Sequence, residues 1–311
     1  MRRRLTLVAV AAMAAASALL STSVSAQAAS PLPVNWNFPS GFLGNAANSA
    51  TPPPGSNDYN CKGTAAKPPV ILVHGTWENQ ADNFQAISPF LKNNGFCVFS
   101  FNYGGNPNDV FWGYGPIAAS AGQLATFVDS VRARTGAAKV DILGHSQGGM
   151  MPRYYIKFLG GYQYVRKMVG LAPSNHGTTL SGLADLGKTL GVNGPLATIQ
   201  PAAIDQTIGS PFMQKLATCP NGLPSADICA GDPVQYTVIE VNGDQVVTPY
   251  TNAFLKGATN IEVNKVCPLE LSEHLGMTYS RNVAQLAVNA LDPSIKKNVC
   301  VVSLPYIGGG N

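Results

Sequence analysis

The sequence predicts an α/β domain with a mostly parallel central sheet flanked by helices. Residues 70–73, 140–143 and 165–171 form mainly apolar runs, which are typical of strands buried on both faces of a parallel sheet. Residues 116–134 precede the second of these runs and carry apolar side chains at helical spacing. A strand, a helix and a second strand at such spacing indicate a parallel crossover, and successive crossovers build a sheet covered on both faces.

The other elements follow from apolar periodicity and turn residues. We expect helices over residues 80–93, 116–134, 147–159 and 277–291, and strands over residues 70–73, 96–101, 140–143, 165–171, 234–241 and 260–266. Residues 180–231 interrupt the alternation of strand and helix with short apolar segments cut by Gly and Pro. An insertion of this kind predicts a cap over a functional site.

The two ends of the domain differ from its middle. Residues 1–28 begin with three arginines and continue with an alanine-rich apolar run that is too short for a membrane anchor, so they predict a removable export signal. The arginines leave a twin-arginine export route open. Residues 29–69 are rich in Pro, Gly, Asn and Ser and predict an irregular arm. The folded domain is therefore expected over residues 70–311, with the cap at 180–231.

The composition limits the possible partners. Of the 311 residues, 45% are hydrophobic and 12% are charged, with 20 basic and 16 acidic side chains. Removing residues 1–28 takes away three arginines and no acid, which leaves 17 basic against 16 acidic side chains. This near balance, without a basic run, argues against nucleic acid as a partner. No second apolar stretch is long enough for a transmembrane anchor, and we expect an extracellular monomer.

Six cysteines in an exported chain predict three disulfides, although six cysteines allow fifteen pairings. Their order along the sequence favours Cys61 with Cys97, Cys219 with Cys229, and Cys267 with Cys300. A metal site is disfavoured because no two cysteines have C-x-x-C spacing and no histidine lies near them in ligand register.

A candidate nucleophile, Ser146, lies in the stretch Gly144-His145-Ser146-Gln147-Gly148, which follows a predicted strand and precedes a predicted helix. G-x-S-x-G in this context indicates a sharp turn that projects the serine Oγ clear of the sheet. The two glycines remove the Cβ atoms that would collide across the turn. The motif by itself arises easily by chance in a chain rich in Gly and Ser, so its context carries the interpretation.

A second candidate segment, His74-Gly75-Thr76-Trp77, follows the first strong strand. At this position the N–H of Thr76 can point at an oxyanion together with the N–H of Gln147, and the hydroxyl of Thr76 is a candidate third donor. The alternative is a simple turn at the end of the strand with a satisfied histidine.

The candidate general base is His274. Three other histidines compete with it: His74 lies in the strand-end loop, His145 occupies the variable position of the serine motif, and His176 precedes any plausible acid. His274 follows the last predicted strand and comes after both the serine and the acid, which is the chain order expected of such a triad.

The candidate acid is Asp244, in the turn directly after the strand that ends at Val241. Asp141 and Glu240 lie inside strands, and Asp232 precedes its strand at the opposite edge of the sheet. The sequence therefore predicts that Ser146, His274 and Asp244 act together, with His274 taking the proton and Asp244 fixing its tautomer.

Four stretches carry a resemblance to a known family: residues 69–77, 144–153, 171–178 and 242–249. They resemble the secreted triacylglycerol lipases of class 2 from actinobacteria, which have the α/β-hydrolase fold. The resemblance implies hydrolysis of long-chain carboxylic esters at an oil–water interface, without a cofactor. The pair of Thr76 and Gln147 is also similar to the oxyanion hole of a fungal lipase.

Two other functions compete with this interpretation. The same acyl-enzyme can pass its acyl group to another alcohol or arise from soluble or polymeric esters, which makes an extracellular acyltransferase or an esterase the first alternative. A hydrolase scaffold that binds lipid without catalysis is the second alternative. The presence of a serine, a histidine and an aspartate in the expected chain order argues against the second alternative.

Overall fold

The computed structural model describes residues 30–192 and 199–310, so the expected export signal at residues 1–28 lies outside the described residues. The chain divides into a unit of Met1–Pro31 and a unit of Leu32–Asn311, and the second unit contains the sheet. Within the described residues, six parallel strands form this sheet in the order β2-β1-β3-β4-β5-β6. The predicted α/β class with a mostly parallel sheet is confirmed.

The strands and helices alternate along most of the chain. The strands are β1 (Val70–Val73), β2 (Val98–Ser100), β3 (Val140–His145), β4 (Val165–Leu171), β5 (Gln235–Glu240) and β6 (Thr259–Glu262). The described helices are α1 (Gln80–Asn83), α2 (Ile87–Asn93), α3 (Ile117–Thr135), α4 (Gln147–Met150), α5 (Pro152–Phe158), α6 (Leu180–Leu190), α8 (Pro201–Gln206), α9 (Pro211–Ala217), α10 (Val263–Val266) and α11 (Arg281–Leu291). Short helical turns occur at Pro39–Leu43, Ala46–Asn48, Gly161–Gln163, Tyr250–Ala253, Gly276–Tyr279 and Pro293–Ile295.

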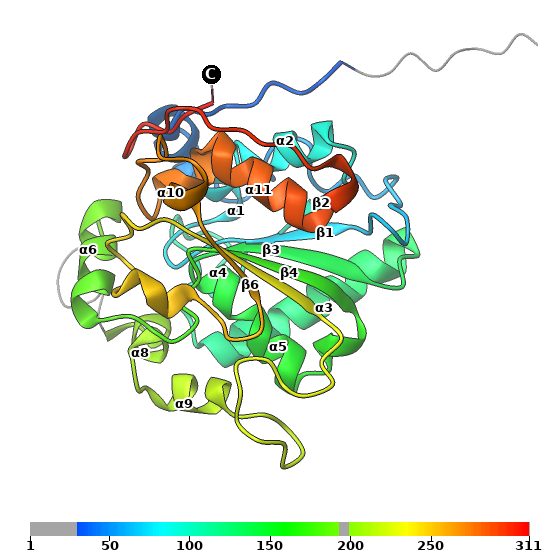
Figure 1. The fold of residues 1–311 in the computed structure, drawn as a ribbon, viewed down its shortest axis with the longest axis vertical. Coiled ribbons are helices and arrows are strands. Elements are labelled where there is room, and N and C mark those ends of the chain that lie inside the picture. Colours follow the sequence, from blue (N-terminus) through cyan, green and yellow to red (C-terminus); the bar gives the residue numbers. More distant parts are fainter. Residues whose placement is uncertain (1–29, 193–198, 311) are drawn as a thin grey trace, which may run out of the picture. The chain divides into compact units, whose positions relative to one another are not determined.

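Helices cover both faces of the sheet (Figure 1). On one face, α2 and α11 pack against Val70 and Leu72 of β1 and Leu143 of β3. On the other face, α3 and α5 pack against Ile71 and Val73 of β1. Successive residues of a strand point to opposite faces, so an uninterrupted apolar strand such as β1 supplies both cores.

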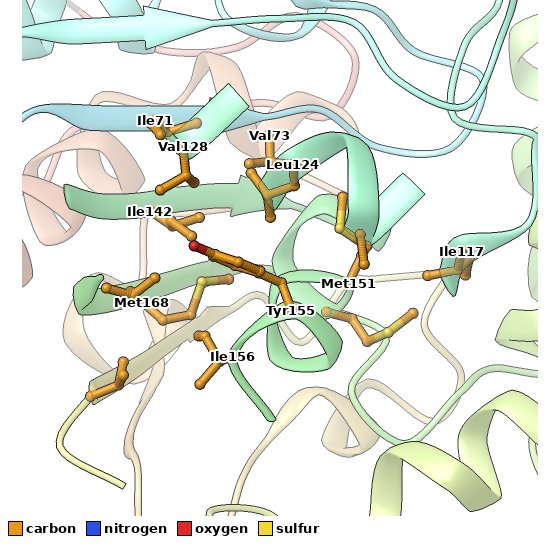
Figure 2. Close-up of a cluster of buried hydrophobic side chains, with 14 of the residues drawn as sticks. Ile71, Val73, Ile117, Leu124, Val128, Ile142, Met151, Tyr155, Ile156 and Met168 are labelled. Carbon is orange, nitrogen blue, oxygen red and sulfur yellow. The ribbon is translucent and has the colours of Figure 1, made fainter. Parts of the chain in front are cut away.

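Aromatic and aliphatic side chains fill the core between the sheet and helices α3 and α5. Figure 2 shows the ring of Tyr155 from α5 lying among Ile142 of β3, Met168 of β4 and Val128 of α3. The four side chains are at most 2% exposed. This packing fixes α5 under the sheet and therefore also fixes the short helix α4 that precedes it.

Two expected helices are divided at proline. The predicted helix over 80–93 is two helices, α1 and α2, and the predicted helix over 147–159 is α4 followed by α5. Proline has no N–H to donate within a helix and is tolerated only in the first turn. Pro89 lies in the first turn of α2, and Pro152 is the first residue of α5. A continuous helix through either proline would lose a hydrogen bond.

Two further boundaries differ from expectation near the carboxyl terminus. The predicted strand over 260–266 ends at Glu262 and continues as α10. Its partner β5 ends at Glu240, which pairs with Glu262, so the edge strand has no partner beyond that residue. The predicted helix over 277–291 begins only at Arg281, where Ser280 caps it by accepting the N–H of Val283.

The segment between β4 and β5 departs from the alternation of strand and helix. Its described part contains α6, α8 and α9. Leu183 and Leu186 of α6 are buried together with Trp77 from the loop after β1. Phe38 and Phe42, from the residues that precede β1, join the same cluster.

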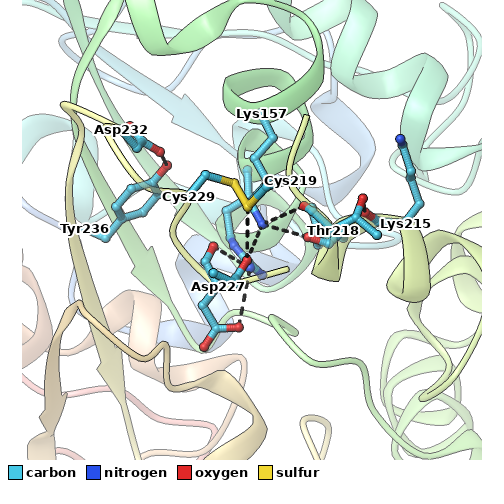
Figure 3. The surroundings of a disulfide bond; sticks show 11 residues. Lys157, Lys215, Thr218, Cys219, Asp227, Cys229, Asp232 and Tyr236 are labelled. Carbon is cyan, nitrogen blue, oxygen red and sulfur yellow. Dashed lines mark hydrogen bonds and ion pairs between the residues drawn. A yellow bond between two sulfur atoms is a disulfide. The ribbon is translucent and has the colours of Figure 1, made fainter. Parts of the chain in front are cut away.

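The three expected disulfides, Cys61–Cys97, Cys219–Cys229 and Cys267–Cys300, are confirmed. Figure 3 shows the surroundings of Cys219–Cys229, where Lys157 of α5 reaches the same loop. The Nζ of Lys157 donates to the carbonyl oxygens of Leu216 at 2.8 Å and Ala226 at 2.7 Å. The disulfide closes the loop, and Lys157 attaches the loop to the core helix α5.

The disulfides allow a comparison of loop lengths. We expect Cys267→Ala with Cys300→Ala, which opens a separation of 33 residues, to lower the free energy of unfolding by about 3.7 kcal/mol. Cys219→Ala with Cys229→Ala, which opens a separation of 10 residues, is expected to lower it by about 2.7 kcal/mol. Urea denaturation of both double variants measures the difference. A larger loss for the shorter loop would contradict an effect through the unfolded chain.

Candidate active site

The turn at Ser146 joins the carboxyl end of β3 to the amino end of α4. Ser146 has φ 55° and ψ −122°, a conformation that L-residues rarely adopt. A Cβ on Gly144 would lie 1.8 Å from the carbonyl oxygen of Gly148, and a Cβ on Gly148 would lie 2.0 Å from that of Val73. Glycine is therefore required at both positions, as the sequence predicts for a sharp turn between strand and helix.

The topology brings this turn next to the loop that follows β1. β1 and β3 are neighbours in the sheet, but the chain continues from β1 to β2 on one side and from β3 to β4 on the other. A crevice forms at the carboxyl ends of strands where the order reverses in this way, and open α/β sheets bind their ligands there. Thr76 and Ser146 both lie at this point.

Asp244 and His274 come together from the two loops that follow β5 and β6. The Nδ1 of His274 lies 2.7 Å from Oδ2 of Asp244, and both side chains are fully buried. The other oxygen, Oδ1, accepts the N–H groups of Val246 at 2.7 Å and Val247 at 2.8 Å. With Oδ1 held by two backbone N–H donors, Oδ2 of Asp244 is placed to accept Nδ1–H of His274.

The side chain of His274 leaves its second nitrogen free for chemistry. In the described part of the chain, the buried Nε2 of His274 has no hydrogen-bond partner. The ring of His145, the residue before Ser146, lies 4.9 Å from the ring of His274 between centroids. Ser146 itself is 3% exposed. An imidazole with Nδ1–H directed at a carboxylate presents a basic Nε2, which is the atom that a serine hydroxyl requires.

The competing acids lie in other environments. Burial and the charge of Asp244 raise the pKa of Glu240 well above its usual range, which favours its neutral form. Asp232 lies before β5 and accepts the hydroxyl of Tyr236 at 2.7 Å. Asp141 pairs with Arg166. Among these carboxyl groups, the described hydrogen bonds join Asp244 alone to His274.

Thr76 and Gln147 lie side by side after β1 and β3. In the described part of the chain, neither backbone N–H has a hydrogen-bond acceptor. The hydroxyl of Thr76 donates to Oε1 of Gln147 at 2.7 Å, so in this structure it does not point at a substrate position. The two amides remain the candidate oxyanion donors.

A residue that the sequence did not indicate, Gln206, contacts both candidate donors. Gln206 is the last residue of α8, and its Nε2 donates to Oγ1 of Thr76 at 2.8 Å and reaches Oε1 of Gln147 at 3.3 Å. Its Oε1 accepts the hydroxyl of Ser174 at 2.8 Å. No local sequence signal identifies Gln206, because it meets Thr76 from 130 positions away.

The remaining histidines have separate partners. His74 is fully buried, and burial lowers its pKa to about 4, so its ring is neutral and stacks on Tyr103. His176 pairs with Asp227 at 2.8 Å on the surface. Within the described ranges, no three His, Cys, Asp or Glu side chains form a group suited to a metal ion. In the same ranges, no helix combines the length and apolar character needed to cross a membrane.

The sheet order and the turn at Ser146 define an α/β-hydrolase. In keeping with this fold, the structure is similar to that of Aspergillus fumigatus lipase B, with a TM-score of 0.58 at 22% identity over 79% of this chain and 56% of that chain. Residues 67–222, half of the chain, match the family described as Lipase (class 2). The protein belongs to this family.

Two curated relatives share part of the sequence. The chain is 39% identical over 95 residues to triacylglycerol lipases of Pseudarthrobacter phenanthrenivorans and Burkholderia plantarii. The matched part is 29% of this chain in both cases, and it spans 28% of the first relative and 25% of the second. The chain therefore matches only about a quarter of the length of these relatives.

The need for glycine in the turn can be tested by comparing the stability of Gly148→Ala with that of Gly122→Ala, a variant in helix α3. We expect Gly148→Ala to lower the free energy of unfolding by about 3 kcal/mol or more, because its Cβ would meet backbone oxygens. A Cβ on Gly122 of α3 meets nothing within 4 Å, so Gly122→Ala is expected to stabilise the protein by about 0.5–1 kcal/mol. Chemical denaturation measures both changes, and a Gly148→Ala protein as stable as wild type would contradict the turn geometry.

Proposed function

We propose that the protein is a secreted carboxylic-ester hydrolase, and specifically a triacylglycerol lipase, that acts through Ser146, His274 and Asp244. The observation that carries the proposal is the buried pair of Asp244 and His274 at 2.7 Å. Nε2 of His274 has no hydrogen-bond partner among the described residues, and its ring lies 4.9 Å between centroids from the ring of His145, the residue before Ser146. Membership of the class 2 lipase family and the names of the two curated relatives support ester hydrolysis.

In the proposed mechanism, Oγ of Ser146 attacks the ester carbonyl while Nε2 of His274 takes its proton. Asp244 accepts the hydrogen bond from Nδ1–H of His274, so Nε2 of His274 remains the unprotonated nitrogen that takes the proton. The tetrahedral oxyanion accepts the N–H groups of Thr76 and Gln147. His274 then returns the proton to the leaving alcohol, and a water activated by the same histidine hydrolyses the acyl-enzyme.

The insertion between β4 and β5 is assigned to a cap over Ser146. Gln206 from this insertion contacts both Thr76 and Gln147, and Ser146 is 3% exposed. Gln206 lies against the side chains of both proposed oxyanion-hole residues, so we include opening of the cap in the proposed catalytic cycle. Leu180, Ile204 and Ile208 of the insertion are about half exposed, which supports contact with an apolar substrate phase.

Three disulfides support an extracellular location, because disulfides persist in oxidising compartments. The proposed export signal at residues 1–28 lies outside the described residues. We propose that the signal is removed and that the domain from residue 29 onward is released outside the cell.

Substitution of the three residues tests the assignment. We expect Ser146→Ala and His274→Ala to abolish hydrolysis of a soluble short-chain ester, and Asp244→Asn to lower turnover by about 10³–10⁴. Asp232→Asn is the matched control, because its carboxyl binds Tyr236 at the other end of β5. Turnover is measured on protein shown to be folded by circular dichroism. An active Asp244→Asn beside an inactive Asp232→Asn would transfer the role of the acid to Asp232.

The physical state of the substrate separates a lipase from the alternative functions. We expect Ile204→Asp with Ile208→Asp to lower activity on emulsified triacylglycerol at least about tenfold more than activity on a soluble ester, because apolar contact with the substrate phase is lost. Val266→Asp is the control: Val266 is 55% exposed but lies at the end of α10, outside the insertion between β4 and β5. Equal losses on both substrates, or transfer of the acyl group to an added alcohol in preference to water, would favour an esterase or an acyltransferase.

A further inference from the structure

His145, the residue before the candidate nucleophile, is buried against two other parts of the active site. Its Nδ1 lies 2.9 Å from Oε2 of Glu78, in the loop after β1. Its Nε2 lies 2.8 Å from the backbone carbonyl oxygen of His274. His145 has no exposed surface and Glu78 is 1% exposed. Sequence analysis places His145 only at the variable position of the serine motif, without a role of its own.

The partners of His145 determine its protonation state. A carbonyl oxygen only accepts, so Nε2 must carry a proton to bond to His274. Oε2 of Glu78 already accepts the N–H of Gly75 at 2.7 Å, so it faces Nδ1 as an acceptor too. Both ring nitrogens of His145 therefore donate, and His145 with Glu78 forms an imidazolium–carboxylate ion pair.

The other charged and titratable groups around the pair are compatible with this state. Burial alone lowers the pKa of His145, but the charge of Glu78 and the hydrogen bonds to Glu78 and His274 raise it above its usual value. The low pKa of His74, about 4, keeps its ring neutral, and burial raises the pKa of Asp82, Tyr103 and Tyr279 well above their usual ranges, which favours their neutral forms. The charge of Asp244 favours the imidazolium.

Asn83 of α1 completes the surroundings. Its amide nitrogen lies 3.1 Å from Nδ1 of His145, and its Oδ1 has no hydrogen-bond partner among the described residues. A half-turn of this amide gives Nδ1–H a second acceptor. The amide of Asn83 is therefore also suited to an imidazolium at His145.

The ion pair connects the backbone beside each proposed catalytic group. Glu78 holds the N–H of Gly75, which precedes the oxyanion donor Thr76. His145 itself precedes Ser146, and it holds the carbonyl of His274. We propose that the His145–Glu78 ion pair is a positioning element that holds the base loop in register with the nucleophile and the oxyanion loop. This inference rests on the proposed function, because it assigns a role relative to those three groups.

The expected effect is on turnover rather than on substrate binding. Neither His145 nor Glu78 is assigned a contact with substrate, whereas a displacement of about 1 Å between reacting groups can cost about 10²-fold in rate. We expect His145→Leu to lower kcat on a soluble short-chain ester about 10- to 100-fold, with KM within about twofold of wild type. His145→Gln retains an N–H that can reach the carbonyl of His274. Its kcat should therefore be at least about threefold higher than the kcat of His145→Leu.

The control is His176→Leu, which removes a histidine from the surface pair with Asp227. It should leave kcat and KM unchanged. All rates are divided by the concentration of sites that react with a fluorophosphonate, so unfolded protein does not enter kcat. An unchanged kcat per reactive site in His145→Leu, with only fewer reactive sites, would overturn the positioning role. Activity in Ser146→Ala would instead overturn the proposed function, so the two failures are distinguishable.

A second measurement does not require a stable variant at position 145. The chain has four histidines, and the His176→Leu protein keeps three of them. In ¹⁵N-histidine-labelled His176→Leu protein at pH 8, we expect the nitrogen chemical shifts of one ring to be those of a doubly protonated imidazolium. Three neutral rings at this pH would overturn the ion pair, and with it the positioning role.

Discussion

The conformation of Ser146 is the constraint on which the rest of the site depends. The residue holds a positive φ between a strand and a helix, and the turn leaves no space for a Cβ at Gly144 or Gly148. Such a conformation persists only where the surrounding structure fixes both ends. The buried strand β3, paired with β1 and β4, fixes one end, and the packing of α5 under the sheet fixes the other. Packing on both faces of the sheet therefore holds Ser146 in this conformation.

Charges behind the turn are arranged so that each buried ionised group faces donors or an opposite charge. Asp244 faces three N–H donors, and Glu78 faces the N–H of Gly75 and the ring of His145. Burial and the charge of Asp244 raise the pKa of Glu240, which disfavours a second charge beside Asp244. Removing one partner of such a group leaves a buried charge without compensation, which is strongly unfavourable. The network therefore restricts the loops after β1, β3, β5 and β6 to one mutual arrangement.

The sequence predicted the fold class, the strands β1 and β4 and the disulfide pairs because each has a local signal or a simple order. It misplaced the helices over 80–93 and 147–159, although Pro89 and Pro152 mark both breaks. Ser146, Asp244 and His274 emerged from motif and chain order, and their catalytic roles stay predictions. Gln206 and the pair of His145 and Glu78 could not be predicted, because these contacts join distant segments: Gln206 meets Thr76 from 130 positions away, and His145 meets Glu78 from 67 positions away.

Covalent capture tests whether Ser146 is the nucleophile of an acyl-transfer site. The protein is incubated with a fluorophosphonate, its intact mass is measured, and the modified peptide is sequenced by mass spectrometry. We expect one adduct per chain, on Ser146, and no adduct when His274 is replaced by alanine. An adduct on a different serine, or an unmodified Ser146 in protein that hydrolyses esters, would contradict it.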